Sequence, residues 1–310
     1  MDKHAERLAL KRVFGAHATK AAESERPDFV THNDSFAHGI EITDLYVSAT
    51  DGKLDNLCGY TTGLLDDTLQ VHKKDRDVIR VDEISIERKN GETIRNVRAI
   101  YRKHPSPVEA FALLTNVVDD KSLKYGDYLA NCDFADLIVC DRNHLFGSEK
   151  DKQLLSAQIL ENRELLIRTP FREVFVLSQA SDPAGYNYYP VRGNAFLVDA
   201  LLLDHLYLEV GGEIDDSQRI PTISCCLKKL GHRATYERLP IESIHIPGWQ
   251  LIFDGLDVKL RDWTPLKDLQ SCLSAICTHD QVCNDLVEML LAKRDETHST
   301  TVIAFPAHDT

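Results

Sequence analysis

Two apolar segments with a helical stretch between them constrain the fold of this chain more than any other feature. Residues 134–141 (FADLIVCD) have the length and continuous apolar character of a strand buried in the centre of a sheet. Residues 172–178 (REVFVLS) have the pattern of a second strand, and residues 149–166 have that of a helix. This alternation predicts an α/β or α+β core in which helices cover a mixed sheet.

Segments closer to the N-terminus supply the other elements of this core. In chain order they are a helix over residues 3–21, a strand pair within 26–47, a polar connection over 48–77, a hairpin over 78–102, and a helix that begins at Pro107. Asn90-Gly91 lies between the two hairpin strands and is a strong signal for a type I′ turn. The predicted fold class is therefore α/β, with a mixed central β-sheet flanked by helices.

A loop-like segment after Ser178 suggests a boundary between two regions. Residues 182–186 (DPAGY) combine proline and glycine, which are typical of loops. Beyond them, residues 196–208 are apolar enough for a buried helix, residues 266–293 have a helical pattern, and short strands lie between. We predict an N-terminal domain over 1–180 and an α+β extension over 181–310, for which the sequence indicates no function.

The charge of the chain restricts how it can bind nucleic acid. A formal net charge of −13 argues against nonspecific coating of nucleic acid, because phosphate contacts require Lys and Arg. The excess of acidic residues lies mostly after residue 181. Basic residues that would flank a groove occur near the N-terminus, namely Lys3, Arg7, Lys11 and Arg12, and Lys73, Lys74, Arg76 and Arg80.

Hydropathy gives no indication of a membrane protein. The most apolar window, residues 194–203, is interrupted by Asp199 and is far shorter than the roughly 18 apolar residues that a transmembrane helix needs. The N-terminal segment MDKHAERLALKRVFGAH lacks the apolar core of a secretory signal. We expect a soluble, cytoplasmic protein without a membrane partner.

The eight cysteines of the chain are predicted to be free thiols, because they are scattered and no secretory signal accompanies them. One cluster has metal-ligand residue types but lacks a CxxC motif, and its spacing also suits helix packing; it consists of Cys272, Cys277, His279 and Cys283. Six histidines crowd the first third without the spacing of a ligand motif, and we expect surface or hydrogen-bonding roles for His4, His17, His32, His38, His72 and His104.

Two carboxylates on neighbouring predicted strands are the candidates for chemistry. Asp28 opens the first strand, and Glu41 lies inside the second, where alternation places Glu41 and Thr43 on one face. Mg²⁺ prefers oxygen ligands and needs only one or two carboxylates beside water and phosphate. The pattern therefore suggests a site for Mg²⁺ or Mn²⁺ at which a bound water would attack a phosphodiester.

The segments RPDF and GIEIT that carry these carboxylates resemble the first two motifs of the PD-(D/E)XK nuclease superfamily. The resemblance covers about residues 3–146 and implies a restriction-endonuclease-like core. It also implies that a glutamate on the first helix joins the metal ligands, and Glu6 is the position that fits. The lysine that the family places two residues after the glutamate is replaced here by Thr43.

The resemblance further implies where the missing cation lies. Some members of the superfamily carry the lysine on the helix after the core strands, and Lys121 and Lys124 occupy one face of such a helix. The implied function is a Mg²⁺- or Mn²⁺-dependent nuclease in genome defence, restriction or repair, with DNA favoured over RNA. A homodimer would allow both strands to be cut.

Two alternatives remain open from the sequence. Thr43 and the acidic C-terminal region suggest a catalytically inactive nuclease-like fold that serves as a protein-interaction or assembly subunit. A ribonuclease is the other alternative, because the metal chemistry on RNA is the same.

Overall fold

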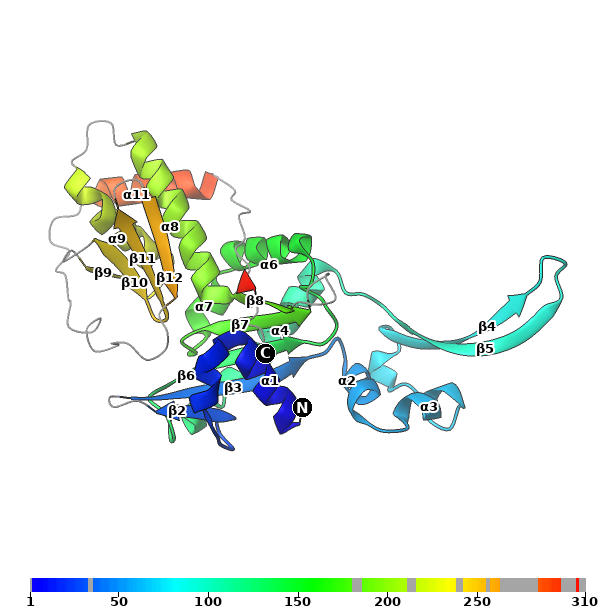
Figure 1. The fold of residues 1–310 in the computed structure, drawn as a ribbon. Helices are drawn as coiled ribbons and strands as arrows, with labels where there is room; N and C mark the ends of the chain where they lie inside the picture. Colours follow the sequence, from blue (N-terminus) through cyan, green and yellow to red (C-terminus); the bar gives the residue numbers. More distant parts are fainter. Residues whose placement is uncertain are drawn as a thin grey trace.

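A mixed β-sheet forms the centre of this computed structural model, with helices on both of its faces (Figure 1). The structure describes residues 2–32, 36–179, 186–210, 216–237, 242–254, 257–262, 284–296 and 305–306. Within these residues the sheet has seven strands, in the spatial order β1 (Ala22–Glu23), β2 (Phe29–His32), β3 (Ala37–Leu45), β6 (Phe134–Asp141), β7 (Val174–Gln179), β8 (Tyr186–Pro190) and β13 (Phe305–Pro306).

The strand directions confirm the predicted mixed sheet. β3, β6 and β7 are parallel to one another, and the remaining neighbours pair antiparallel. β6 is the fourth of the seven described strands and is buried from Ala135 to Asp141, as its apolar sequence predicts. β8 lies on the C-terminal side of residue 180 and extends the same sheet through its pairing with β7.

Different helices cover the two faces of the sheet. Alternation along β6 sends Ile138 to the face covered by α1 (Lys3–Phe14) and Leu137 to the opposite face. The helices on that opposite face are α4 (Pro107–Ser122), α5 (Tyr125–Tyr128), α6 (Glu149–Glu161) and α7 (Glu164–Arg168). The helix predicted over 3–21 is α1 followed by a 3₁₀ helix, Gly15–Lys20. Among the described residues, no helix combines the length and apolar character that crossing a bilayer would require.

α4 begins where the sequence predicts and ends earlier than its apolar stripe suggests. The Ser106 side chain accepts a hydrogen bond from the Glu109 backbone, and the Glu109 carboxylate accepts one from the Ser106 backbone. This capping box and Pro107 in the first turn fix the start of the helix. The helix ends at Ser122, and the short α5 follows it.

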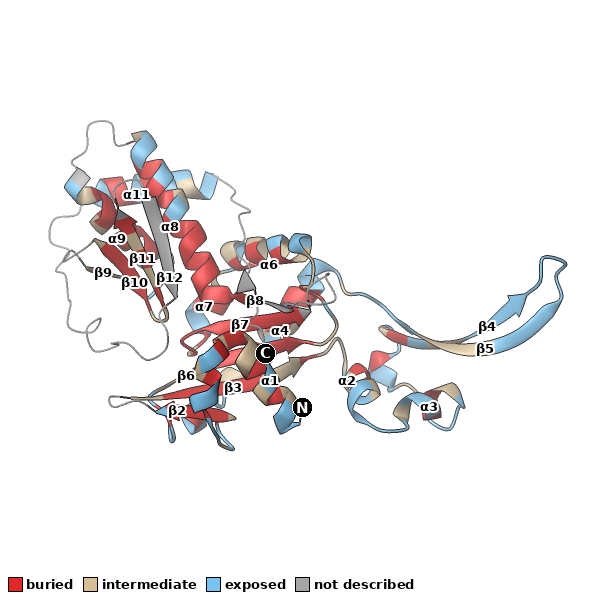
Figure 2. Ribbon diagram, in the orientation of Figure 1, coloured by how far each residue is buried: buried red, intermediate tan, exposed pale blue. Residues whose placement is uncertain are grey.

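A two-stranded arm projects from the core between β3 and β6 (Figure 1). It consists of β4 (Ile79–Glu87) and β5 (Thr93–Arg102), most of whose residues are exposed (Figure 2). Three short helices occupy the preceding connection, namely α2 (Ala49–Asn56), α3 (Tyr60–Leu65) and the 3₁₀ helix Lys73–Asp75.

The turn of the arm differs from the predicted type I′. A type I′ turn needs a positive φ at both central residues, whereas Gly91 has a φ of 83° and Asn90 does not have a positive φ. The loop is longer than two residues: Arg88 N–H donates to the Glu92 carbonyl at 2.8 Å, and Gly91 N–H donates to the Arg88 carbonyl at 2.9 Å. Gly91 therefore supplies the only left-handed residue of this turn.

The C-terminal region forms an α+β unit around a second sheet. Among the described residues this sheet has four antiparallel strands, in the order β12 (Asp257–Asp262), β11 (Trp249–Asp254), β10 (Ser243–Ile246) and β9 (Thr235–Glu237). Its helices are α8 (Val191–Val210), the 3₁₀ helix Asp216–Gln218, α9 (Arg219–Lys229) and α11 (Asn284–Glu296). α8 includes the buried helix predicted over 196–208. The candidate cluster of Cys272, Cys277, His279 and Cys283 lies outside the described residues.

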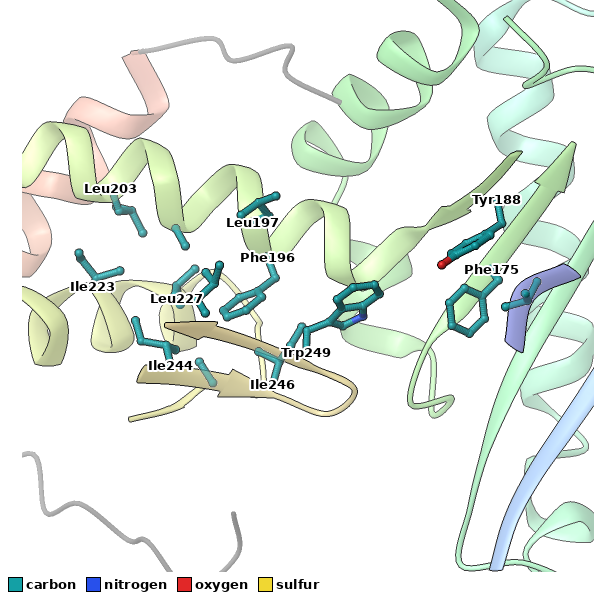
Figure 3. Packing of buried hydrophobic residues seen from close by; sticks show 14 of the residues in the cluster. Phe175, Tyr188, Phe196, Leu197, Leu203, Ile223, Leu227, Ile244, Ile246 and Trp249 are labelled. Atoms are coloured by element: carbon teal, nitrogen blue, oxygen red, sulfur yellow. The ribbon is translucent and has the colours of Figure 1, made fainter. Parts of the chain in front are cut away.

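α8 joins the two sheets, because its first turns pack on the central sheet and its later turns pack on the second one. Trp249 lies between Phe175 of the central sheet and the cluster beneath α8 (Figure 3). The Trp249 indole donates a hydrogen bond of 2.6 Å to Glu173. The same carboxylate accepts from the backbone N–H groups of Arg192 and Gly193, at 2.8 and 2.9 Å, and so caps α8.

Candidate functional site

Asp28 and Glu41 lie opposite each other on adjacent chain segments. β2 pairs antiparallel with β3 so that Phe29 is opposite Ile40, and Asp28, one residue earlier, is therefore level with Glu41. Ile40 belongs to the core under α1, whereas Glu41 meets a lysine from α4 on the other face. The Glu41 side chain is 8% exposed and that of Asp28 is 16% exposed. The predicted adjacency of the two carboxylates is therefore present in the structure.

Asp28 is held by one backbone donor and one lysine. Its Oδ2 accepts a hydrogen bond of 2.8 Å from the backbone N–H of Ile42, beside Glu41 on β3. Its Oδ1 accepts from Lys3 Nζ at 3.1 Å. Asp28 therefore has a structural role at the start of β2, where its side chain takes up a donor of the neighbouring strand.

Glu6 reaches this site through Lys3. It lies on the first turns of α1 and is 8% exposed. Lys3 Nζ is 2.8 Å from Glu6 Oε2, so one ammonium group contacts both Glu6 and Asp28. Burial alone would lower the pKa of Lys3, but these two carboxylates raise it above its ordinary value. The predicted third carboxylate thus lies next to Asp28, with a lysine between them.

The structure distinguishes the two candidate lysines of the helix from residue 107. Lys121, in the last turn of α4, places Nζ 2.6 Å from Glu41 Oε1. Lys124 is exposed and follows the end of α4, as the residue before α5. Within the described part of the chain no hydrogen bond or ion pair links Lys124 to either carboxylate. The end of the helix at Ser122 is the reason that the two side chains do not share one face.

Glu41 occupies an environment that disfavours its charge. Burial raises the pKa of Glu41, the charge of Asp28 raises it further, and Lys121 partly offsets both effects. Tyr128 is 1% exposed, and burial beside Glu41 and Asp28 raises its own pKa. Its hydroxyl completes no hydrogen bond of good geometry within the described residues. The cationic Lys121 is therefore the main group that stabilises ionised Glu41.

The donor set fits a cation that takes few ligands from the protein. In the described ranges, no three side chains of His, Cys, Asp or Glu gather closely enough to enclose a metal ion. Among the described residues, Glu6 Oε2 is nevertheless buried and accepts no hydrogen bond of good geometry, although it lies 2.8 Å from the ammonium group of Lys3. Mg²⁺ commonly binds one or two carboxylates and completes its shell with water and phosphate. Asp28 and Glu41, with Glu6 behind them, are the residues that would hold such an ion.

A second buried charge cluster lies on the other face of β3 and has a structural role. Asp136 of β6 accepts hydrogen bonds from His38 at 2.9 Å and from Arg172 at 2.9 Å. Burial would raise the pKa of Asp136, but Arg172 and His38 together lower it to about 2. His38, one of the six clustered histidines, therefore has a hydrogen-bonding role, as predicted for that group. The described cysteines are free thiols, also as predicted: Cys58, Cys132, Cys140, Cys225 and Cys226.

Lys3 is the site residue whose role the sequence does not reveal. It appears in the sequence as one of four basic residues on the first helix, and its contact with Asp28 depends on how α1 packs against the sheet. The spacing of Lys3 and Glu6 is a local signal for their ion pair. No protein-family model, curated protein or solved structure matches the chain.

Proposed function

We propose that the protein is a nuclease that uses Mg²⁺ or Mn²⁺ and cleaves DNA, with a restriction-endonuclease-like core formed by α1, β2, β3, α4 and β6. The observation that carries this proposal is the meeting of Asp28, Glu41 and Lys121. The two carboxylates lie level on neighbouring chain segments, and the lysine reaches Glu41 at 2.6 Å from a different element. Cytoplasmic genome defence, restriction or repair is the setting that we propose for this activity.

Each residue has a distinct part in the proposed reaction. Asp28 and Glu41 would hold the metal ion. The carboxylate of Glu6, next to Asp28, would add negative charge that attracts the ion. The bound ion would polarise the scissile phosphate and lower the pKa of the attacking water. Lys121 would leave Glu41 as the metal neutralises that carboxylate, and would then contact a phosphate oxygen whose negative charge increases in the transition state. Lys121 would thus serve in place of the lysine that Thr43 replaces.

Cleavage assays with matched lysine variants test this proposal. The wild-type chain is incubated with supercoiled plasmid, single-stranded DNA and RNA, with Mg²⁺, with Mn²⁺ or with EDTA. We expect metal-dependent cleavage of DNA that Asp28→Asn and Glu41→Gln abolish and that Lys121→Met lowers by about 10²-fold or more. Lys124→Met is the control and should cleave like wild type. Undiminished cleavage by Asp28→Asn would reject the assignment, and cleavage of RNA alone would establish a ribonuclease instead.

An inactive assembly subunit is the second candidate, and the paired state of the carboxylates favours it. Lys3 and Lys121 already neutralise Asp28 and Glu41, and Thr43 leaves the family's lysine position without a cation. This candidate predicts no cleavage with either metal and a stable complex with a protein partner or a second copy. Light scattering after size-exclusion chromatography, with and without DNA, distinguishes a homodimer from a monomer.

A further inference from the structure

The ammonium group of Lys3 contacts the carboxylates that a metal ion would need. Lys3 Nζ lies 2.8 Å from Glu6 Oε2 and 3.1 Å from Asp28 Oδ1, so a cation already bridges these two side chains. The Glu6 and Asp28 side chains are only 11% and 16% exposed, and water screens their mutual repulsion weakly. A positive charge between them is therefore needed in the absence of metal.

The two lysines of the site differ in how firmly they are held. Lys121 extends from the end of a 16-residue helix, and its side chain is 21% exposed. The Lys3 side chain is 46% exposed and comes from the first residue of α1. Its flexible chain leads directly to solvent, so the ammonium can withdraw from the two carboxylates without a change in the backbone. Lys3 is thus the cation that an incoming ion can replace with the smaller change in structure.

We propose that Lys3 is an exchangeable internal cation that occupies the carboxylate cluster in the metal-free protein and must leave before a divalent ion binds. The inference rests on the proposed function for the identity of the ion. It assigns to Lys3 a role different from that of Lys121: Lys3 competes with the metal and moves into solvent, whereas Lys121 stays in the site and contacts the phosphate. The ammonium would move into solvent and release Asp28 to bind the ion, whose positive charge would then offset the repulsion between Asp28 and Glu6.

Competition of this kind predicts a measurable gain when the lysine is removed. The apparent affinity for an ion is reduced by the fraction of molecules in which the site is blocked. If Lys3 blocks about nine molecules in ten, its removal strengthens binding by about tenfold. Lys3→Met keeps much of the aliphatic side chain and removes the ammonium, whose Nζ lies 5.4 Å from the centre of the Phe29 ring.

Binding of Mn²⁺ to the full-length chain tests the inference without relying on catalysis. Free Mn²⁺ is measured by electron paramagnetic resonance, and heats are measured by calorimetry, for wild type, Lys3→Met and Arg7→Met. Arg7 is the matched control: it lies one turn further along α1, also over Phe29, but it pairs with Glu23. We expect Lys3→Met to bind Mn²⁺ about tenfold more tightly than wild type, and Arg7→Met to bind within twofold of wild type.

Other outcomes overturn the inference or separate it from the proposed function. Equal or weaker Mn²⁺ binding by Lys3→Met overturns the role of Lys3, and so does an equal gain in Arg7→Met, which would reveal a general charge effect. The absence of binding in all three proteins overturns both proposals. Metal-dependent cleavage by wild type without a gain in Lys3→Met overturns this inference alone. A gain in Lys3→Met without cleavage of any nucleic acid leaves Lys3 as proposed and rejects the nuclease.

Discussion

Lys121 and Glu41 form a close ion pair, 2.6 Å from Nζ to Oε1, between the last turn of α4 and the middle of β3. The two residues are far apart in sequence, and the pair connects the helix layer to the sheet at the candidate site. Because the Glu41 carboxylate is 8% exposed, its charge depends on this one lysine more than on water.

Removal of Lys121 should therefore destabilise the protein in a pH-dependent way. Lys121→Met leaves ionised Glu41 buried without its cation, and we expect a loss of about 1–3 kcal/mol at pH 8. At pH 4, where Glu41 takes up a proton, the loss should be much smaller. Urea unfolding at the two pH values measures both, with Lys124→Met as the control. An equal loss at both pH values would show that the pair contributes packing rather than charge.

Neutralising Asp28 should lower the pKa of Glu41. The charge of Asp28 is one of the causes that raise the pKa of Glu41, after burial. Asp28→Asn removes this charge and keeps an oxygen that accepts from Ile42 N–H. The Glu41 carboxyl signal, followed by NMR during a pH titration, should then move at a lower pH than in wild type. An unchanged Glu41 titration would mean that the two carboxylates are not close in solution.

Glu173 should make the protein less stable as the pH rises from about 4.5 to about 7. Burial raises the pKa of Glu173 from 4.5 to about 7, although several N–H donors favour its charged form. The folded state then binds more protons than the unfolded state between these values, so the stabilisation is complete below pH 4.5 and lost above pH 7. The difference is roughly 3 kcal/mol.

Urea unfolding of wild type and Glu173→Gln across this pH range checks the expectation: the stability of wild type relative to the variant should fall as the pH rises from 4.5 to 7. The Gln variant should also be less stable at every pH, because its amide nitrogen cannot accept from Trp249 or Gly193. The buried histidines His38, His232 and His245, whose pKa values burial lowers, add stability as the pH rises, so only the difference between wild type and Glu173→Gln reports on Glu173. A difference that stays constant between pH 4.5 and 7 would contradict the raised pKa of Glu173.

Gly193→Ala should loosen the contact between the two sheets. A Cβ at position 193 would lie 2.3 Å from Trp249 Cε2, so the indole ring must move. We expect a loss of about 1–3 kcal/mol and a red shift of tryptophan fluorescence as the ring becomes more exposed. Gly126→Ala is the control, because a Cβ there meets no atom within 4 Å. Equal melting temperatures for the two variants would contradict the tight packing at Gly193.

Shortening the arm should leave the core intact. Residues 85–96 are exposed and pair with one another, so a two-residue turn that joins Ile84 to Val97 removes almost no buried contact. The free energy of unfolding should change by less than about 1 kcal/mol. A large loss in thermal unfolding of the shortened chain would instead show that the arm supports the core.

The sequence predicts the features that depend on local pattern. The apolar run of β6 indicates its central position, and strand alternation places Ile40 and Glu41 on opposite faces. Asp28 and Glu41 are close because a short connection joins their two strands. These features follow from neighbouring residues alone.

The features that sequence does not predict depend on how separate elements pack. Lys121 and Lys124 look equivalent until the end of α4 at Ser122 is known. The contact of Lys3 with Asp28 requires the position of α1 on the sheet. Asn90-Gly91 predicts a tighter turn than the one that forms, because the bulge after Ile86 changes the register of the strands.

The position of α8 has a practical consequence for expressing parts of this protein. A fragment that ends at residue 180 lacks both β8 and α8, so β7 loses its antiparallel neighbour and Phe175 loses the Tyr188 ring that packs against it. The newly exposed strand edge and apolar surface would favour aggregation. A fragment that ends with α8 at residue 210 would keep these contacts but would expose the later turns of that helix, which pack on the second sheet. The Asp28 site is therefore best studied in the full chain.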